Sequence, residues 1–229
     1  PYYTSRSSYS GIVDLAGFKK DRFYLYQARW RPDLPMVHIL PHWNWAGREG
    51  QVTPVHVFTS GDEAELFLNN VSMGRQLLDQ YKYRLRWDDI TYEPGELHVV
   101  SYKAGKLWAE ATVRTTGPAV SLRLTADRQS ISADGVDLSY ITADVLDSQG
   151  SVVPTANPEI EFSVSGSGEI IATDNGDPAD LVAFTSTNRK AFSGKALAIV
   201  KALKRNGTIS IVAKGEGLTS GEITLNLLT

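Results

Sequence analysis

The sequence predicts a mainly β protein with two immunoglobulin-like β-sandwich domains in tandem, preceded by a loop and one α-helix. From residue 52 onward, short runs of alternating apolar and polar residues are separated by turn residues at intervals of roughly 8–12 residues. Upstream of that point, one segment has the periodicity of a helix. A length of 229 residues is enough for one or two domains that each bury a core.

Residues 1–19 are rich in Ser, Tyr and Gly and are predicted to form a loop. Asp21 is a suitable N-cap, and the helix after it has one face formed by Phe23, Tyr26, Gln27 and Trp30. Pro32 and Pro35 end the helix, because proline removes a donor and restricts the residue before it. A helix of about 11 residues is not stable alone, so its aromatic face is expected to pack on another element.

The segment from His38 to Trp45 holds two of the five Trp and two of the four His. The composition changes here from a helix to a series of strands, which indicates a seam between domains. A second break is expected at Thr116-Gly117-Pro118. The predicted domains are therefore residues 1–35, 36–117 and 118–229.

In the middle domain, strands are expected at residues 52–58, 65–68, 71–74, 81–87, 97–102 and 107–115. Asn69-Asn70 is typical of a tight hairpin, because Asn tolerates positive φ. Trp87 and Trp108 lie inside strands and are predicted to be core residues.

In the last domain, seven strands are expected at residues 120–125, 140–146, 160–164, 169–173, 196–203, 208–213 and 222–227. This number of strands in about 110 residues is typical of an immunoglobulin-like domain.

The composition excludes several classes of function. With 26 acidic and 23 basic residues the net charge is −3, so we expect no nucleic-acid partner and no polybasic membrane patch. No apolar run approaches the ~20 residues of a membrane span. The chain has no Cys, which excludes disulfides and thiolate chemistry. It begins Pro1-Tyr2-Tyr3 without Met or a signal peptide, so we expect a piece of a longer protein.

A search for catalytic groups finds no convincing set, and we expect no catalytic residue and no cofactor in this chain. Asp88 and Asp89 are adjacent and would point to opposite faces of a strand. Glu159 and Glu161 share a face, but at an exposed strand edge they are expected to be solvated. The His residues lack zinc-site spacing, so hydrogen bonding at an interface is the better role for His38 and His42.

The best cluster of oxygen ligands is Asp174-Asn175-Gly176-Asp177, with Asp180 close behind. Calcium takes six to eight oxygen ligands, so Asp174, Asn175 and Asp177 are weak calcium candidates. The same residue types are also common in tight turns, and a turn is the favoured interpretation.

Trp43, Asn44 and Trp45 are the candidates for binding a sugar. An indole ring can stack on the apolar face of a pyranose while a polar neighbour reaches the hydroxyl groups. The favoured alternative is that these Trp residues are buried between the helix and the first sandwich.

SSYSGIVDLAGF (7–18), KDRFYLYQ (20–27) and HILPHWNW (38–45) resemble the end of the catalytic barrel in glycoside hydrolase family 2, of the bacterial β-galactosidase type. ELFLNN (65–70) and YEPGEL (92–97), with Ser72 and Gly74, look like the β-sandwich that follows. DNGDP (174–178) and RKAFSG (189–194) resemble its terminal immunoglobulin-like domain, a type shared with bacterial adhesins.

The resemblance implies that residues 1–30 are the loop after the last strand, and the last helix, of a (β/α)8 barrel. It places the two catalytic glutamates of a retaining enzyme upstream, about 5–5.5 Å apart. No position here matches either motif, so this chain is expected to be inactive alone. The expected partners are carbohydrate, through the parent enzyme, its own barrel, and further copies in a homo-oligomer. The expected location is exported, periplasmic or on a bacterial cell surface.

The leading hypothesis is a non-catalytic C-terminal portion of a β-galactosidase that supports the barrel, the rim of the active site or oligomerisation. The alternative is a stand-alone carbohydrate-binding or cell-surface adhesion module, and a third is a spacer. If the first is correct, the helix face of residues 23–30 has lost most of its natural partner. That face is then expected to be exposed, disordered or packed on another molecule.

Overall fold

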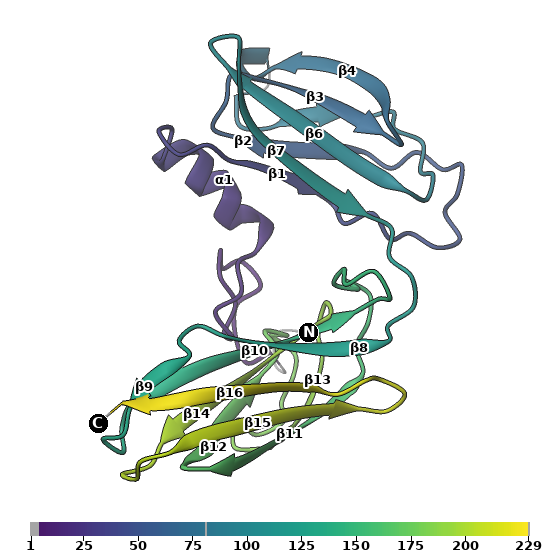
Figure 1. The fold of residues 1–229 in the computed structure, drawn as a ribbon. Helices are drawn as coiled ribbons and strands as arrows, with labels where there is room; N and C mark the ends of the chain where they lie inside the picture. Colours follow the sequence, from purple (N-terminus) through teal and green to yellow (C-terminus); the bar gives the residue numbers. More distant parts are fainter. Residues whose placement is uncertain (1–4, 81, 229) are drawn as a thin grey trace. The chain divides into compact units, whose positions relative to one another are not determined.

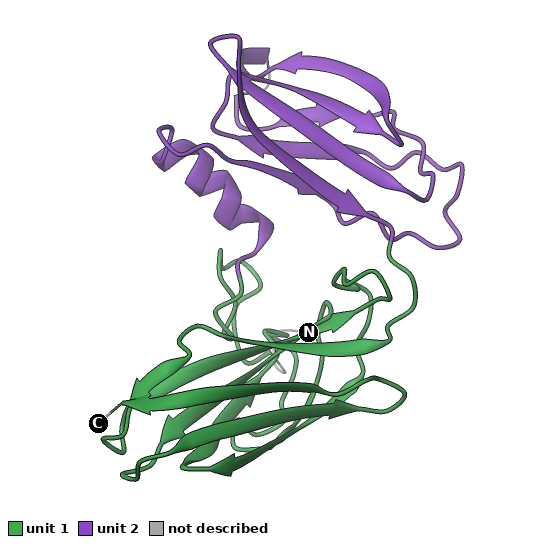
Figure 2. Cartoon of the chain, viewed as in Figure 1, with its two compact units in different colours: residues 1–18, 116–229 green, residues 19–115 purple. Residues whose placement is uncertain are grey.

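The computed structural model describes residues 5–80 and 82–228, and it is mainly β, as predicted (Figure 1). Contacts divide the chain into two units, residues 19–115 and residues 1–18 with 116–229 (Figure 2). The predicted domain boundaries describe domains of a longer protein. The two contact units do not test those boundaries, which stay a prediction. Residues 1–4 of the predicted loop, and Tyr81 of the predicted strand 81–87, lie outside the described residues.

The unit of residues 19–115 contains one helix and two antiparallel sheets. The helix is α1 (Asp21–Trp30). The first sheet has the order β1-β2-β5 and the second β4-β3-β6-β7. The strands are β1 (Val37–Leu40), β2 (Val55–Thr59), β3 (Glu63–Leu68), β4 (Val71–Leu77), β5 (Leu85–Trp87), β6 (Glu96–Lys103) and β7 (Lys106–Arg114).

The inner faces of these two sheets form one core, so the unit is a β-sandwich. Strand alternation sends one set of side chains inward. The core residues from the strands are Ile39, Val55, Val57, Ala64, Leu66, Leu68, Leu85, Trp87, Leu97 and Val99. Trp87 is a core residue, as predicted. Trp108, also predicted to be a core residue, is only half-buried and lies outside this core. Its indole N–H donates to the Ser60 hydroxyl (2.8 Å), and the Lys103 amine lies 4.5 Å from its ring centre.

Helix α1 lies on the outer face of the β1-β2-β5 sheet and contacts β1 and β2. The predicted N-cap is wrong: Lys20 is the cap residue, and Asp21 is the first helical residue. The Asp21 carboxylate pairs with His38 Nε2 at 2.8 Å, and the Tyr24 ring stacks on the His38 ring at 3.9 Å. His38 therefore makes the interface hydrogen bond expected of it, because strand alternation turns it outward while Ile39 enters the core.

The packed face of α1 differs from the predicted aromatic stripe. Ala28 is buried and Tyr24 and Leu25 are half-buried, whereas Tyr26 is 40% and Trp30 71% exposed. Exposure of the stripe is thus confirmed for these two residues, while Phe23 and Gln27 are half-buried. The sequence marks which side of a helix is apolar, but not which neighbour is present to cover it.

The hairpin at Asn69-Asn70 is confirmed. Both residues have positive φ, 48° and 66°, in the turn between β3 and β4. Asn69 is also held by its side chain, whose Oδ1 accepts from the Glu96 N–H (2.8 Å) and whose Nδ2 donates to the Pro94 carbonyl (3.3 Å). Asn70 is exposed, so its positive φ is the main constraint on which residue can occupy position 70.

The other unit is a second sandwich with sheets β12-β14-β10-β8 and β13-β11-β15-β16-β9. Both sheets contribute to its core. All seven predicted strands are present. The strands are β8 (Ser121–Ala126), β9 (Ser130–Ser132), β10 (Leu138–Leu146), β11 (Glu159–Gly166), β12 (Gly168–Asp174), β13 (Asn188–Lys190), β14 (Lys195–Ala202), β15 (Thr208–Gly215) and β16 (Gly221–Leu228).

Three strands were not predicted: β1, β9 and β13. β9 and β13 each have three residues, too few for alternation to stand out, and β9 pairs parallel to β16, a partner distant in sequence. β1 lies in the seam segment, which was expected to be extended but not paired with β2. Conversely, predicted strand 52–58 starts at Val55, and predicted strand 81–87 is reduced to β5 after Lys82, whose φ is positive (54°).

The N-terminal loop docks on the second sandwich, at the loop of residues 174–184. The Arg6 N–H donates to the Pro178 carbonyl (2.6 Å), and its guanidinium donates to the Val182 carbonyl (3.0 Å) and covers the Phe184 ring at 4.2 Å. The Asp14 carboxylate approaches Gly176 so closely that a Cβ there would lie 2.1 Å from Oδ2. Both this approach and the positive φ of +79° favour a glycine at residue 176.

The 174–184 loop is itself anchored by Arg189, whose side chain is wholly buried. Its Nη1 pairs with Asp180 Oδ2 at 2.8 Å, and Nη2 donates to the carbonyls of Thr173 and Ala183, both at 2.9 Å. Burial raises the pKa of Asp180, but the hydrogen bond from the Val182 N–H and the guanidinium outweigh it, so the pKa is lowered overall. Arg189 thus joins strand β13 to the loop on which Arg6 rests.

Among the described residues, no helix has both the length and the apolar character that a bilayer span requires.

Replacing Asn70 tests the hairpin. Asn70→Val places a β-branched residue at positive φ, so the free energy of unfolding should fall by about 1–2 kcal/mol. Asn70→Gly is the matched control and should change it by less than about 0.5 kcal/mol. Urea denaturation followed by Trp fluorescence is the measurement, because all five Trp lie in residues 19–115. Equal losses in both variants would contradict the conformational explanation.

Replacing Arg189 tests the buried ion pair. Arg189→Met leaves Asp180 without its cation and should destabilise the second sandwich by about 3–5 kcal/mol. Because the Asp180 pKa is lowered on folding, the pair stabilises above the unfolded pKa of about 3.9, and this is lost as pH falls through the folded pKa. The gap between wild type and variant should therefore shrink in acid. Calorimetry is the measurement, and exposed Arg205→Met should differ little from wild type. A gap independent of pH would contradict the assignment.

Candidate functional site

Trp43 is wholly buried in the core of the first sandwich. Its indole N–H donates to the Glu93 carbonyl (2.9 Å), and its ring meets the Tyr92 ring edge-on at 5.0 Å. The Thr115 hydroxyl donates to the Trp43 carbonyl at 2.5 Å. Neither face of its ring reaches the surface, which fits the favoured interpretation of Trp43 as a buried residue and gives no support to sugar stacking.

Asn44 and Trp45 are half-buried beside it. The Asn44 side chain donates to the Arg114 carbonyl (3.2 Å), and the Trp45 ring stacks on His42 at 4.4 Å, with Arg48 5.2 Å from its centre. Burial lowers the pKa of His42, which favours the neutral ring, and Nδ1 accepts a hydrogen bond from the Asn44 N–H (3.2 Å). The Asn44 amide and the Trp45 ring are therefore already in contact with neighbouring residues. Sugar binding by Asn44 and Trp45 stays a prediction.

The oxygen cluster at residues 174–180 is arranged as a turn. Asp174 Oδ1 accepts from the N–H groups of Asn175 and Gly176, and Asn175 Oδ1 accepts from the Asp177 N–H. Asn175 Nδ2 donates to Asp180, whose charge is matched by Arg189. Among described residues, no group of three or more His, Cys, Asp or Glu is placed to hold a metal. The geometry favours the turn over the calcium hypothesis for Asp174, Asn175 and Asp177.

The carboxylates considered as catalytic candidates lie at the surface. Asp88 pairs with Arg86 at 2.9 Å and both are solvent-accessible. Glu159 and Glu161 are exposed on β11. These positions fit solvated side chains.

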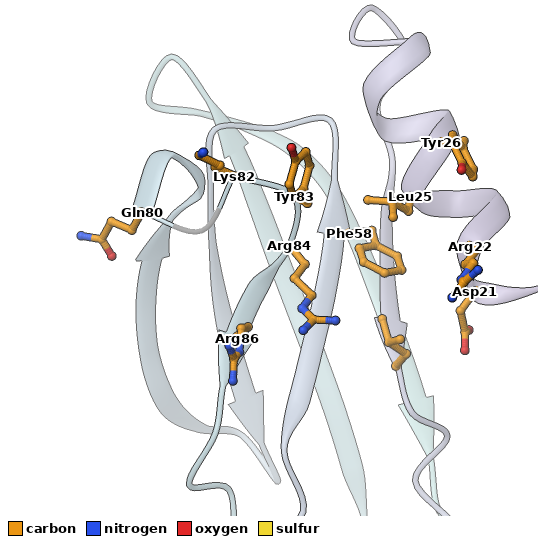
Figure 3. A pocket seen from close by; sticks show the side chains of 11 residues that line it. Asp21, Arg22, Leu25, Tyr26, Phe58, Gln80, Lys82, Tyr83, Arg84 and Arg86 are labelled. Atoms are coloured by element: carbon orange, nitrogen blue, oxygen red, sulfur yellow. The ribbon is translucent and has the colours of Figure 1, made fainter.

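A feature that the sequence analysis did not identify is an open cleft of about 920 Å³ on the outer face of the β1-β2-β5 sheet. Figure 3 shows Leu25 and Phe58 on the helix side of this cleft and Arg84 and Arg86 on the β5 side. The lining residues are Asp21, Arg22, Leu25, Tyr26, Leu40, Phe58, Gln80, Lys82, Tyr83, Arg84 and Arg86.

Strand alternation creates the basic side of this cleft. Leu85 and Trp87 enter the core, so Arg84 and Arg86 project from the opposite face. Arg86 lies opposite His56 in the register of β2 and β5. The pKa of His56 is lowered, first by burial and then by the two arginines. The alternating RLRW pattern of residues 84–87 was a usable signal for a basic outer face, but nothing in it located α1 beside that face.

Two family models match the chain. Residues 122–224 match "Glycoside hydrolase family 2 C-terminal domain 5", and residues 50–109 match "Domain of unknown function (DUF4982)". The first match covers most of the second sandwich, and the second covers much of the first sandwich.

Relatives and solved structures agree with these matches. The chain is 38% identical over 227 residues to the beta-galactosidase BoGH2A of Bacteroides ovatus, covering 99% of this chain and 26% of that protein. It is 30% identical to a putative beta-glucuronidase of Formosa agariphila, covering 96% of this chain and 21% of that protein. A beta-glycosidase from Bacteroides vulgatus aligns with TM-score 0.92 at 32% identity, over 98% of this chain and 29% of the other.

The chain therefore spans about a quarter of the length of these relatives. Each sandwich matches a family model, and the similarity to these relatives covers almost the whole chain. This chain belongs to glycoside hydrolase family 2 and represents part of its C-terminal region.

Proposed function

We propose that the chain is the non-catalytic C-terminal portion of a β-galactosidase that hydrolyses terminal β-galactosides with retention. The observation that carries this proposal is the 38% identity over 227 residues to a beta-galactosidase. Relatives named as beta-glucuronidases are less similar, at 30% and 29% identity. In this proposal the two catalytic carboxylates belong to the upstream barrel, and both sandwiches are immunoglobulin-like supporting domains.

The N-terminal segment supports a role at the barrel. We assign residues 5–18 to the loop after the last barrel strand, and α1 to the last barrel helix. The exposed Tyr26 and Trp30 suit this assignment, since neighbouring barrel elements would cover them. Each sandwich then holds one of two consecutive barrel segments: Arg6 and Asp14 contact the 174–184 loop, and α1 rests on the β1-β2-β5 sheet.

The contacts of Arg6 and Asp14 lie where they could affect the active site of the barrel. Active sites of (β/α)8 barrels lie at the face built by the loops that follow the strands. A loop after the last strand belongs to that face, and the Arg6 and Asp14 contacts would restrict its motion. The second sandwich therefore helps to shape the rim of the active site while contributing no catalytic group.

Activity assays test the location of the chemistry. This chain alone should release no product from a chromogenic β-galactoside or β-glucuronide, whereas the parent protein should cleave the galactoside faster. The control is circular dichroism, to show that the chain is folded under assay conditions. Turnover by the isolated chain would place a catalytic group within residues 1–229, and a preference of the parent for the glucuronide would overturn the substrate assignment.

Replacing Arg6 in the parent protein tests the rim. Arg6→Ala removes the bond to Val182 and the contact with Phe184, so kcat/KM should fall by about tenfold as the loop loses its position. Arg205→Ala, an exposed change in the same unit, should leave kcat/KM unchanged. Equal kinetics for Arg6→Ala and wild type would contradict the rim role and leave the family membership intact.

A further inference from the structure

The cleft on the outer face of the β1-β2-β5 sheet carries excess positive charge. It is lined by Arg22, Lys82, Arg84 and Arg86 against a single carboxylate, Asp21. That carboxylate is already paired with His38. Arg86 has a surface partner in Asp88, but Arg22, Lys82 and Arg84 have no ion pair within the part of the chain that the structure describes.

The charge is combined with apolar surface. Leu25 and Tyr26 from α1, and Phe58 from β2, line the same cleft, and Tyr83 is 64% exposed at its edge. A cleft with guanidinium groups beside aromatic rings suits an occupant that brings carboxylates flanked by apolar side chains. Arginine is well suited to this role, because its planar guanidinium binds a carboxylate with two parallel hydrogen bonds.

The cleft continues an interface that the structure already contains. Helix α1 covers the β1 side of the sheet face and binds it through a carboxylate, the Asp21–His38 pair. The uncovered remainder of the same face holds Arg84 and Arg86. Asp21 and Arg22, the first two residues of α1, line the cleft themselves, so the start of this helix lies at its edge.

The relatives contain the chain length needed to fill it. The chain corresponds to 26% of the beta-galactosidase it resembles, so most of that relative lies outside the matching region. In the proposed function, this remainder includes the upstream catalytic barrel. We propose that the Arg84–Arg86 cleft is a docking site for a carboxylate-bearing segment of the upstream catalytic barrel. This inference rests on the proposed function, and it names the surface through which the first sandwich would contact the barrel.

Zero-length cross-linking of the parent protein with a carbodiimide tests the occupant. The reagent joins a lysine amine to a carboxylate in contact with it, and Lys82 supplies the amine at the cleft. Mass spectrometry should find Lys82 joined to an Asp or Glu upstream of residue 1. Lys82→Arg keeps the charge but removes the amine, so this cross-link should vanish in that variant while the thermal stability of the parent stays unchanged.

Charge reversal tests the contribution of the two arginines. Arg84→Glu/Arg86→Glu should remove most of the Lys82 cross-link and lower the melting temperature of the parent. Arg205→Glu/Lys214→Glu makes the same change in charge at exposed positions of the other unit and should do neither. Arg84→Gln/Arg86→Gln is the milder variant if reversal prevents folding. Trp fluorescence of this chain alone reports on the folding of residues 19–115, because all five of its Trp lie there.

Each alternative occupant has its own result. Cross-links from Lys82 to this chain's own carboxylates between isotope-labelled and unlabelled copies would mean a dimer interface and overturn the proposal. Binding of free galacturonate by the parent, lost in Arg84→Glu/Arg86→Glu with no upstream cross-link, would mean a sugar site and also overturn it. A parent that cleaves the galactoside but gives no upstream cross-link refutes the docking site alone. An upstream cross-link in a parent inactive on the galactoside refutes the proposed function alone.

Discussion

Burial of Trp43 is the constraint on which the first sandwich depends. Its side chain lies in the core, its N–H is satisfied by the Glu93 carbonyl, and its own carbonyl accepts from Thr115 at the end of β7. An indole contributes a large apolar area, and its N–H needs a partner once buried. These bonds tie the seam segment to two distant parts of the unit, and β1 just before it is fixed as a result, with α1 against its outer face.

The sequence allowed prediction of features whose cause is local. Asn69-Asn70 specified a turn because few other residues adopt positive φ at low cost, and the long alternating strands were found because their period is visible. Features set by distant partners were missed: β9 depends on β16, and the packed side of α1 depends on the sheet beneath it. Trp43 and Trp45 differ by two positions, and only the surrounding fold makes one core and the other half-exposed.

The same limit applies to the candidate sites. Asp174, Asn175 and Asp177 have a composition that suits either an ion or a turn, and only the structure shows the turn hydrogen bonds that they make. The basic cleft shows the reverse case. Its arginines alternate with core residues in a pattern visible in the sequence, but a basic outer face becomes a cleft only when α1 lies beside it.

Arg189 and Arg84 differ in the partners that this chain supplies to them. Arg189 can be wholly buried because its own unit supplies a carboxylate and several carbonyls, so its desolvation is compensated. Arg84 stays exposed, and its positive charge helps to lower the pKa of the nearby His56. A cation can be desolvated only where its partners are present. The partners of Arg189 lie within the second sandwich, and the proposed docking site would place carboxylates of the barrel beside Arg84.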